Sequence, residues 1–302
     1  MIIKTVILVA MWISAAGYSV WWYLHRLTRL RTNAFSLAVG AVTNFFDTLG
    51  IGSYATTTAA LRFRRSIRDA DLPGTLNAGH CLPVIVQALI FIASVNVGAV
   101  TLFAMIAAAV FGAWIGASIV SGLPVRIVRF AMAAALLVAA VLFAMINLDI
   151  LPGGGTATDL SGSRLAIAVT ANALFGVLCT IGIGLYAPCL ITLSLLGMNP
   201  LAAFPIMMGS GALLMPIAGG RFLATGKVDQ KIALGLTLGG IPGVLIAAYL
   251  VKSMPLSLLR WLVIGVVVYT AVQLLRTNRS ERRHISGALV AASGTTLEEY
   301  TK

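Results

Sequence analysis

One eight-residue segment occurs twice in this chain. Residues 48–55 read Thr-Leu-Gly-Ile-Gly-Ser-Tyr-Ala, and residues 180–187 read Thr-Ile-Gly-Ile-Gly-Leu-Tyr-Ala. Both copies lie in apolar surroundings, and other landmarks repeat at a spacing one residue shorter. Because such a shift corresponds to a single loop insertion, the sequence indicates a duplicated module. The pairs at the shorter spacing are Gly112/Gly243, Ile115/Ile246, Ala117/Ala248, Pro124/Pro255 and Arg129/Arg260.

The composition indicates an integral membrane protein. Of the 302 residues, 59% are hydrophobic and 10% are charged, whereas soluble domains have about one half apolar and one quarter charged residues. The apolar runs are continuous and do not alternate with polar positions, so we expect spanning helices rather than a barrel. The formal charge of +12 comes from residues clustered at helix ends, which is typical of a cytoplasmic membrane face and not of nucleic-acid binding.

The sequence contains no pattern that indicates an enzyme, a metal site or a cofactor. Cys81, Cys179 and Cys189 lie in apolar segments, without the spacing of a disulfide framework or a zinc site. The chain also lacks the common hydrolase, metalloprotease and nucleotide motifs. We therefore expect no catalytic residue, no bound metal and no cofactor. A membrane-embedded thiol enzyme, with Cys179 or Cys189 beside His80, is the less favoured alternative.

Arginine clusters predict the topology. The apolar run 2–24 ends in aromatic residues and precedes an arginine cluster, so we expect a retained first helix with its N-terminus outside. Arginines also flank the apolar stretch 34–61 on both sides. Both clusters lie inside if this stretch is a re-entrant pair of half-helices that turns near Gly50 and Gly52. If the stretch spans instead, one cluster is left outside.

The duplication predicts an all-α fold of two inverted-topology repeats, with about seven transmembrane helices and two re-entrant hairpins. The second hairpin is expected over 165–198, and each repeat then contributes three crossings. The remaining spans are expected near 76–95, 99–121, 127–146, 203–222, 230–251 and 256–275. The predicted segments are an N-terminal helix with a basic loop (1–31), repeat 1 (32–146), an external loop (147–164), repeat 2 (165–276) and a cytoplasmic tail (277–302).

The repeated glycines suggest an anion site inside the membrane. Where each hairpin turns, the returning half-helix begins with amide groups that have no partner in the helix, and these suit a negative charge. Close helix packing is the alternative role for the glycines. The candidate substrate-binding residues are Thr48, Gly50, Gly52, Ser53, Tyr54, Thr180, Gly182, Gly184 and Tyr186.

Asp47 and His80 are the candidates for proton coupling. Asp47 immediately precedes the first octet, and an acid inside a membrane is costly and functional by default. Capping of the broken helix is an equally good interpretation of Asp47. The equivalent position in the second copy is Cys179. His80 begins an apolar span, where it can either serve a proton relay or simply pack against its neighbours.

Several segments of the second half share a pattern with a known family. They are GSGAL at 209–213, TGKVD at 225–229, LGGIPG at 238–243 and PLSLLR at 255–260. Together with the glycine octets, they make residues 34–276 similar to the sulfite exporter TauE/SafE family of membrane permeases. Ser53 and Leu185 stand where that family often has a third glycine.

The resemblance implies a secondary transporter in the cytoplasmic membrane that works by alternating access. Its implied substrate is a small anion, with sulfite or an organosulfonate as the leading class, and transport would be driven by the membrane potential or by protons as the coupling ion. An anion channel of the same architecture is the nearest alternative. The expected partners are thus the anionic substrate, the lipid bilayer and protons, and the sequence leaves an oligomer open.

Overall fold

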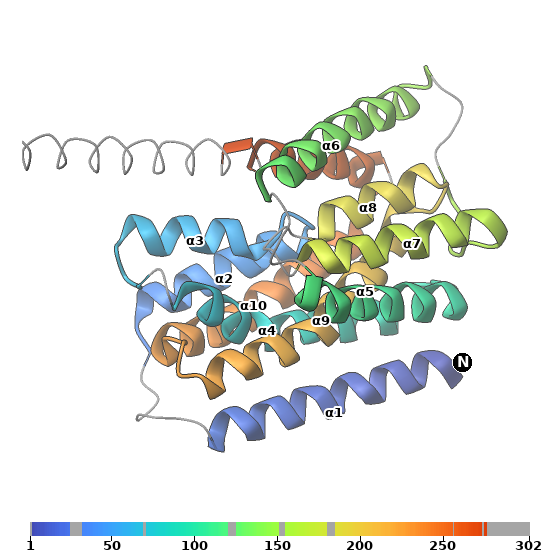
Figure 1. Cartoon of the computed structure of the whole chain (residues 1–302). Coiled ribbons are helices and arrows are strands. Elements are labelled where there is room, and N and C mark those ends of the chain that lie inside the picture. Colours follow the sequence, from blue (N-terminus) through green and yellow to red (C-terminus); the bar gives the residue numbers. More distant parts are fainter. Residues whose placement is uncertain are drawn as a thin grey trace, which may run out of the picture.

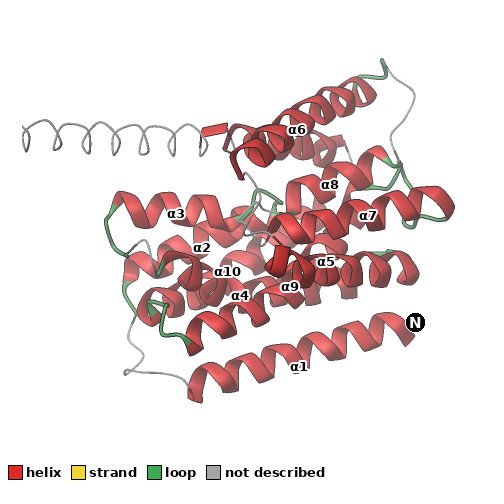
Figure 2. Cartoon of the chain, in the orientation of Figure 1, coloured by secondary structure: helices red, strands yellow, loops and turns green. Residues whose placement is uncertain are grey.

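Every regular element that the structure describes is a helix (Figure 2). The computed structural model describes residues 2–24, 32–68, 71–119, 125–150, 155–179, 185–255, 257–273 and 275–276. Its helices are α1 (Ile2–Leu24), α2 (Ala34–Thr48), α3 (Ser53–Phe63), α4 (Leu72–Ser94), α5 (Ala99–Ile119), α6 (Val125–Asn147), α7 (Gly162–Cys179), α8 (Tyr186–Leu195), α9 (Pro200–Ala224), α10 (Gln230–Ser253) and a last helix over Ser257–Gln273.

The helices define a membrane-embedded protein. Within the described residues, five helices are long and apolar enough to cross a bilayer: Ile2–Leu24, Gly74–Ser94, Gly162–Cys179, Pro200–Ala224 and Gln230–Ser253. Large apolar side chains such as Trp12, Trp114 and Tyr249 are exposed on the outside of the bundle. Lipid is the solvent that suits such a surface.

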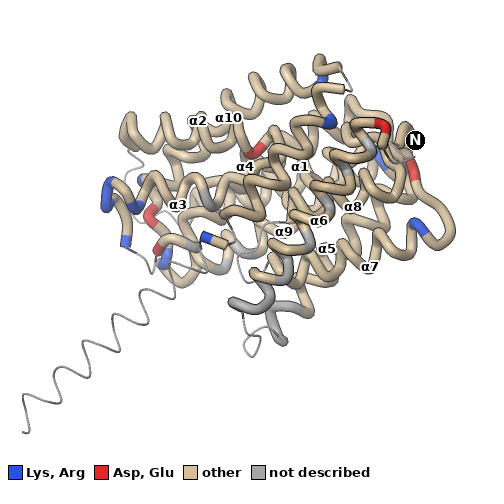
Figure 3. Tube along the Cα trace, turned by 90° about the horizontal axis from the view of Figure 1, so that it is seen from above, with Lys and Arg blue, Asp and Glu red and all other residues tan. Residues whose placement is uncertain are grey.

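The two ends of the bundle carry most of the charge. We call them the α3–α4 end, where α3 ends and α4 begins, and the α8–α9 end, which lies opposite (Figure 1). Seen from above, the charged residues gather at these ends, while uncharged residues fill most of the length between them (Figure 3). This is the distribution expected where the middle of the bundle lies in hydrocarbon.

The first predicted hairpin is present, with its break at the expected glycines. Gly50 and Gly52 follow α2 with φ angles of 93° and 86°, values that favour glycine because it has no Cβ. After the break, α3 runs back toward the end from which α2 came (Figure 1). The 34–61 stretch is therefore two half-helices and not one spanning helix.

The second predicted hairpin corresponds to α7, which ends at Cys179, and α8, which begins at Tyr186. Both arms meet the same end of the bundle (Figure 1). There, the residues that precede α7 pair with the turn that follows α8, since the amide of Asn199 donates to the carbonyl of Ala157 at 2.8 Å. The predicted site residues Thr180, Gly182 and Gly184 lie outside the described residues.

Close helix contacts hold the two hairpins in the bundle. Helix α2 packs against α10, and α7 packs against α5. A Cβ atom on Gly112 of α5 would lie 1.9 Å from the carbonyl oxygen of Ala173, and one on Gly243 of α10 would lie 2.2 Å from that of Ala41. Any residue larger than glycine would force these backbones apart, which is typical of small-residue packing in membranes.

Candidate ligand site at the helix breaks

Asp47 joins the two arms of the first hairpin. Its side chain is 3% exposed, and its Oδ1 accepts a hydrogen bond from the backbone amide of Ser53, the first residue of α3, at 2.6 Å. Its Oδ2 accepts a second bond from Nε2 of Gln87 on α4 at 2.9 Å. The capping interpretation of Asp47 is thus confirmed. Since the Ser53 amide is already used, the prediction that this first amide of α3 is free for a substrate is wrong.

His80 connects three helices around the same break. Its Nδ1 lies 3.1 Å from Oδ1 of Asn44 on α2, and its Nε2 lies 3.0 Å from the hydroxyl of Thr57 on α3. Because an amide oxygen only accepts, Nδ1 carries a hydrogen, and in the neutral ring Nε2 then accepts from the Thr57 hydroxyl. All three side chains are fully buried. In this state the imidazole is neutral and satisfied, as expected for a packing residue.

The four predicted hydroxyls of the site that lie in the described residues fall into two groups. Thr48 donates to the carbonyl of Asn44 at 2.8 Å, and Tyr54 donates to Oδ1 of Asn77 at 2.8 Å. The hydroxyls of Ser53 and Tyr186 have no hydrogen-bond partner among the described residues, although these residues are only 2% and 7% exposed. Buried hydroxyls are normally bonded, so these two are the ones available to a ligand.

The free hydroxyl of Tyr186 lies close to α4 and α9. It is 3.0 Å from the place of a Cβ on Gly211, and a methyl of Val84 is 3.4 Å from the same place. Val84 and Gln87 lie three residues apart on one face of α4. The carboxylate of Asp47 also lies within electrostatic range of the Tyr186 hydroxyl. Tyr186 therefore belongs to the same polar centre as Asp47 and Gln87.

The two hairpins contact one another at this centre. A Cβ on Gly50 would lie 3.4 Å from Cδ2 of Leu190, one turn into α8, and 3.7 Å from Cε of Met207 on α9. The break of the first hairpin is thus next to the first turn of the returning arm of the second. This placement brings Gly50 of the first hairpin against Leu190 of the second, from parts of the chain far apart in sequence.

The starts of the two returning half-helices differ. The start of α3 is capped by Asp47, whereas α8 begins at Leu185 without a side-chain cap among the described residues. Cys179, the residue equivalent to Asp47, has no carboxylate. As far as the described residues extend, the start of α8 thus keeps the partial positive charge of a helix N-terminus.

Gln87, Asn44 and Thr57 are site residues that the sequence analysis missed. Gln87 could have been recognised from the sequence as the one amide side chain in the otherwise apolar run 81–93. Polar side chains in such runs tend to face the protein interior. Nothing in the sequence indicated that its partner is Asp47, forty residues earlier.

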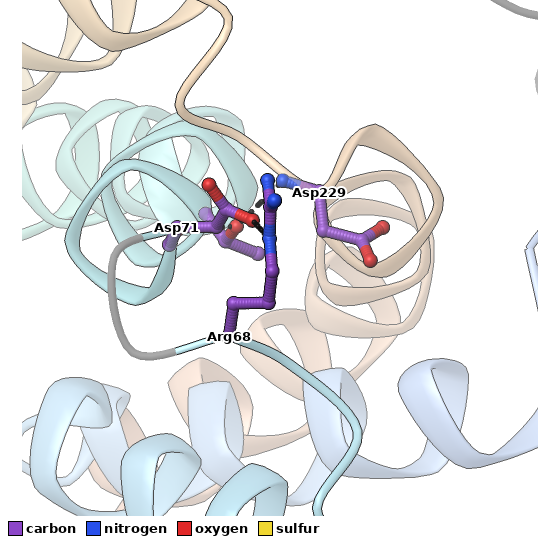
Figure 4. Close-up of polar contacts among 4 residues, drawn as sticks. Arg68, Asp71 and Asp229 are labelled. Carbon is purple, nitrogen blue, oxygen red and sulfur yellow. Dashed lines mark hydrogen bonds and ion pairs between the residues drawn. The ribbon is translucent and has the colours of Figure 1, made fainter.

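A second polar cluster lies at the α3–α4 end (Figure 4). Nε of Arg68 donates to the Asp71 carboxylate at 2.6 Å, and the Arg68 side chain extends between Asp71 and Asp229. The hydrogen bond to Asp71 and the charge of that carboxylate raise the pKa of Arg68. The amide of Asp229 donates to Thr75 at 2.9 Å. A hollow of about 440 Å³ lies here, and its acids are already engaged in holding the loops together.

The described residues form no metal site of His, Cys, Asp and Glu side chains, and comparison with known proteins identifies no relative. Among the described residues, no three His, Cys, Asp or Glu side chains come together as a metal site, and the three cysteines are free. No family model, curated protein or solved structure matches the chain. The class that the fold defines is an all-α membrane protein with a buried polar centre at a broken helical pair.

Proposed function

We propose that this protein is a secondary transporter for a small anion. The observation that carries the proposal is a pair of buried hydroxyls without a partner among the described residues, Ser53 Oγ at the start of α3 and Tyr186 Oη at the start of α8. Hydroxyl and amide donors around a helix N-terminus bind oxyanions without placing a lysine in the bilayer. Neutral donors also release the ligand readily, as turnover requires.

The close helix contacts support two inverted repeats. At the spacing of the octets Ala41 is equivalent to Ala173, and at the shorter spacing Gly112 is equivalent to Gly243. The carbonyl of Ala173 approaches Gly112, and the carbonyl of Ala41 approaches Gly243. The same contact therefore occurs twice, once with the glycine in the first half and once with the glycine in the second half. A two-fold axis that relates the two copies would produce this arrangement. Transporters with this symmetry place their substrate between the repeats, near the middle of the membrane.

The arrangement of the hairpins fits alternating access. The first hairpin has both ends at the α3–α4 end and the second has both ends at the α8–α9 end, and they meet in between (Figure 1). Rocking one repeat against the other would open the centre to each side in turn. We assign the α3–α4 end to the cytoplasm because Arg62, Arg64, Arg65 and Arg68 lie there.

The substrate class follows from the resemblance to TauE/SafE permeases, and we propose sulfite or an organosulfonate. The binding centre offers the hydroxyls of Ser53 and Tyr186 as donors to an oxyanion, and none of the buried residues that the structure describes is a lysine or arginine. In this assignment the protein lies in the cytoplasmic membrane, with its N-terminus outside. Asp47, and not the fully bonded His80, is the residue through which we expect transport to be coupled.

Uptake into proteoliposomes tests this function. We expect saturable sulfite uptake that is competed by sulfoacetate, and a loss of uptake of about tenfold or more when Ser53→Ala and Tyr186→Phe are combined, because each removes a donor to a charged ligand. Tyr18→Phe is the matched control, since its buried hydroxyl on α1 donates to the carbonyl of Ala78. Unitary currents would identify a channel instead, and full uptake by the double variant would reject this site.

A further inference from the structure

Unused oxygen atoms surround the Asp47 carboxylate. Gln87 is fully buried, and while its Nε2 donates to Asp47, its Oε1 has no partner among the described residues. Ser53 offers its amide to the same carboxylate and leaves its hydroxyl unpartnered. Gln87 and Ser53 thus each donate one hydrogen bond to the buried Asp47 carboxylate, and each also has one oxygen atom without a partner among the described residues.

The charge of Asp47 also lacks a counter-ion. No lysine or arginine is among the buried residues that the structure describes, and the other buried aspartate, Asp71, is paired with Arg68. Two hydrogen bonds and the start of α3 reduce the cost of the charge. They leave a net negative centre inside the membrane, where an unpaired charge is expensive.

A bound metal cation satisfies this arrangement better than a proton does. A proton on Oδ2 of Asp47 could be accepted only if the Gln87 amide turned to present Oε1, and this turn would leave Nε2 without a partner in its place. The groups that lack partners are instead oxygen atoms, and oxygens of carboxylate, amide and hydroxyl groups are the ligands of hard cations. The end of α2, where a helix dipole is negative, adds to the attraction.

We propose that Asp47, Gln87 and Ser53 form a binding site for one alkali-metal cation, and Na⁺ is the ion used to test it. The Ser53 hydroxyl can serve both ligands, because its oxygen lone pairs can face the cation while its hydrogen faces the anion. Its use as the coupling ion rests on the proposed transport function, whereas cation binding itself does not. In transporters with broken helices, C-terminal ends of half-helices coordinate cations, and N-terminal ends face anionic groups. Here the break after α2 would take the cation and the start of α8 the anion, so that the two charges enter the core together.

The test compares purified full-length protein in NaCl and in choline chloride at equal ionic strength. We expect Na⁺ to raise the midpoint of thermal unfolding in a saturable manner. We also expect it to increase the apparent affinity for sulfite. Gln87→Leu should weaken the Na⁺ effect by about tenfold or more, because it removes one ligand oxygen and one bond to the carboxylate.

Gln87→Glu keeps the size of the side chain and predicts the opposite change. It places a second acid beside Asp47, so this variant should be less stable than wild type in choline and show a larger Na⁺-induced shift. The matched controls are Gln273→Leu and Gln273→Glu, since this amide donates to Tyr269 in the last helix, away from Asp47. Both should retain the wild-type Na⁺ response.

The outcomes separate this inference from the transport function. Equal stability and equal sulfite uptake in NaCl and choline chloride would overturn the cation site while leaving anion transport in place. Uptake that depends on a pH gradient and not on Na⁺ would overturn the role of this cation as the coupling ion. A Na⁺-induced shift that disappears in Gln87→Leu, in a protein that binds no sulfite, would support the cation site and reject the proposed anion.

Discussion

The amide of Ser53 lies 2.6 Å from Oδ1 of Asp47, across the gap between α2 and α3. This bond places a carboxylate where the start of α3 would otherwise attract an anion. The second hairpin has Cys179 at the equivalent position, and no side chain among the described residues caps α8. The residues that precede the two octets therefore differ: Asp47 accepts from the first amide of α3, whereas Cys179 has no carboxylate to offer to α8.

A cap introduced into the second hairpin should compete with the anion. Cys179→Asn supplies a side-chain oxygen that can accept a bond from the first turn of α8, as Asp47 does for α3. We expect the apparent affinity for sulfite to fall by about fivefold, which corresponds to a cap worth about 1 kcal/mol. Thermal stabilisation by sulfite measures this change. Cys179→Ala is the control and should bind sulfite like wild type, and an unchanged affinity in Cys179→Asn would argue against an anion at the start of α8.

Two buried tyrosines should respond differently to loss of their hydroxyls. Tyr186 has no partner for its hydroxyl among the described residues, whereas Tyr18 donates to Ala78. Removing an unsatisfied group is nearly neutral for folding, so Tyr186→Phe should change the free energy of unfolding by less than about 0.5 kcal/mol. Tyr18→Phe should lower it by about 0.5–1 kcal/mol.

Transport should show the reverse order for the same two variants. Tyr186→Phe should reduce sulfite uptake, and Tyr18→Phe should leave it intact. Thermal unfolding and proteoliposome uptake, measured on the same preparations, provide the comparison. A Tyr186→Phe protein that is less stable but transports normally would assign this hydroxyl a structural role.

The glycines of the first break should be required for transport beyond their contribution to folding. Gly52 has a φ of 86°, and a Cβ there would meet no atom within 4 Å. Gly52→Ala therefore introduces only backbone strain, of about 1–3 kcal/mol, because a φ of 86° with a ψ of 134° lies in a region that residues with a Cβ rarely adopt. Gly226 has a φ of 67° and is equally open, but it lies in the turn between α9 and α10.

Gly226→Ala is thus a matched control for Gly52→Ala. We expect both variants to lose similar stability, and only Gly52→Ala to lose sulfite uptake, because its strain distorts the break that positions Ser53 and Asp47. Equal uptake by the two variants would show that the conformation of this break does not matter for transport.

The local features of the fold could be predicted from the sequence. The break at Gly50 and Gly52 follows from residues that tolerate positive φ. The expected spans near 76–95 and 230–251 correspond to α4 and α10, because apolar length and flanking charge act within one segment. Within the described residues, five helices reach the length and hydropathy of a membrane span. Four of them correspond to expected spans, of which about seven were predicted, and the fifth, α7, belongs to the predicted second hairpin.

The partners within the site could not be predicted in the same way. Tyr54 and Tyr186 occupy the same place in the two octets, yet Tyr54 bonds to Asn77 while Tyr186 faces Gly211. Which side chain meets each tyrosine depends on the register of α4 and α9 against the hairpins. That register is set by packing between distant segments, and no short pattern in the sequence encodes it.

Equivalent glycines in the two halves provide the last prediction. A Cβ on Gly112 would lie 1.9 Å from the carbonyl of Ala173, and one on Gly243 would lie 2.2 Å from that of Ala41. Gly112→Ala and Gly243→Ala should therefore each lower the free energy of unfolding by about 1–3 kcal/mol, because the helices must separate to admit a methyl group. Thermal unfolding in detergent measures both losses.

Two open glycines are the controls for this pair. A Cβ on Gly17 in α1 or on Gly265 in the last helix would meet no atom within 4 Å, and neither glycine has a positive φ. Alanine there should stabilise by about 0.5–1 kcal/mol, because it restricts the unfolded chain and favours the helix. If the two halves pack equivalently, the free energy of unfolding should fall by similar amounts in Gly112→Ala and Gly243→Ala and should rise in both control variants. A loss at only one of them would argue against equivalent packing of the two halves.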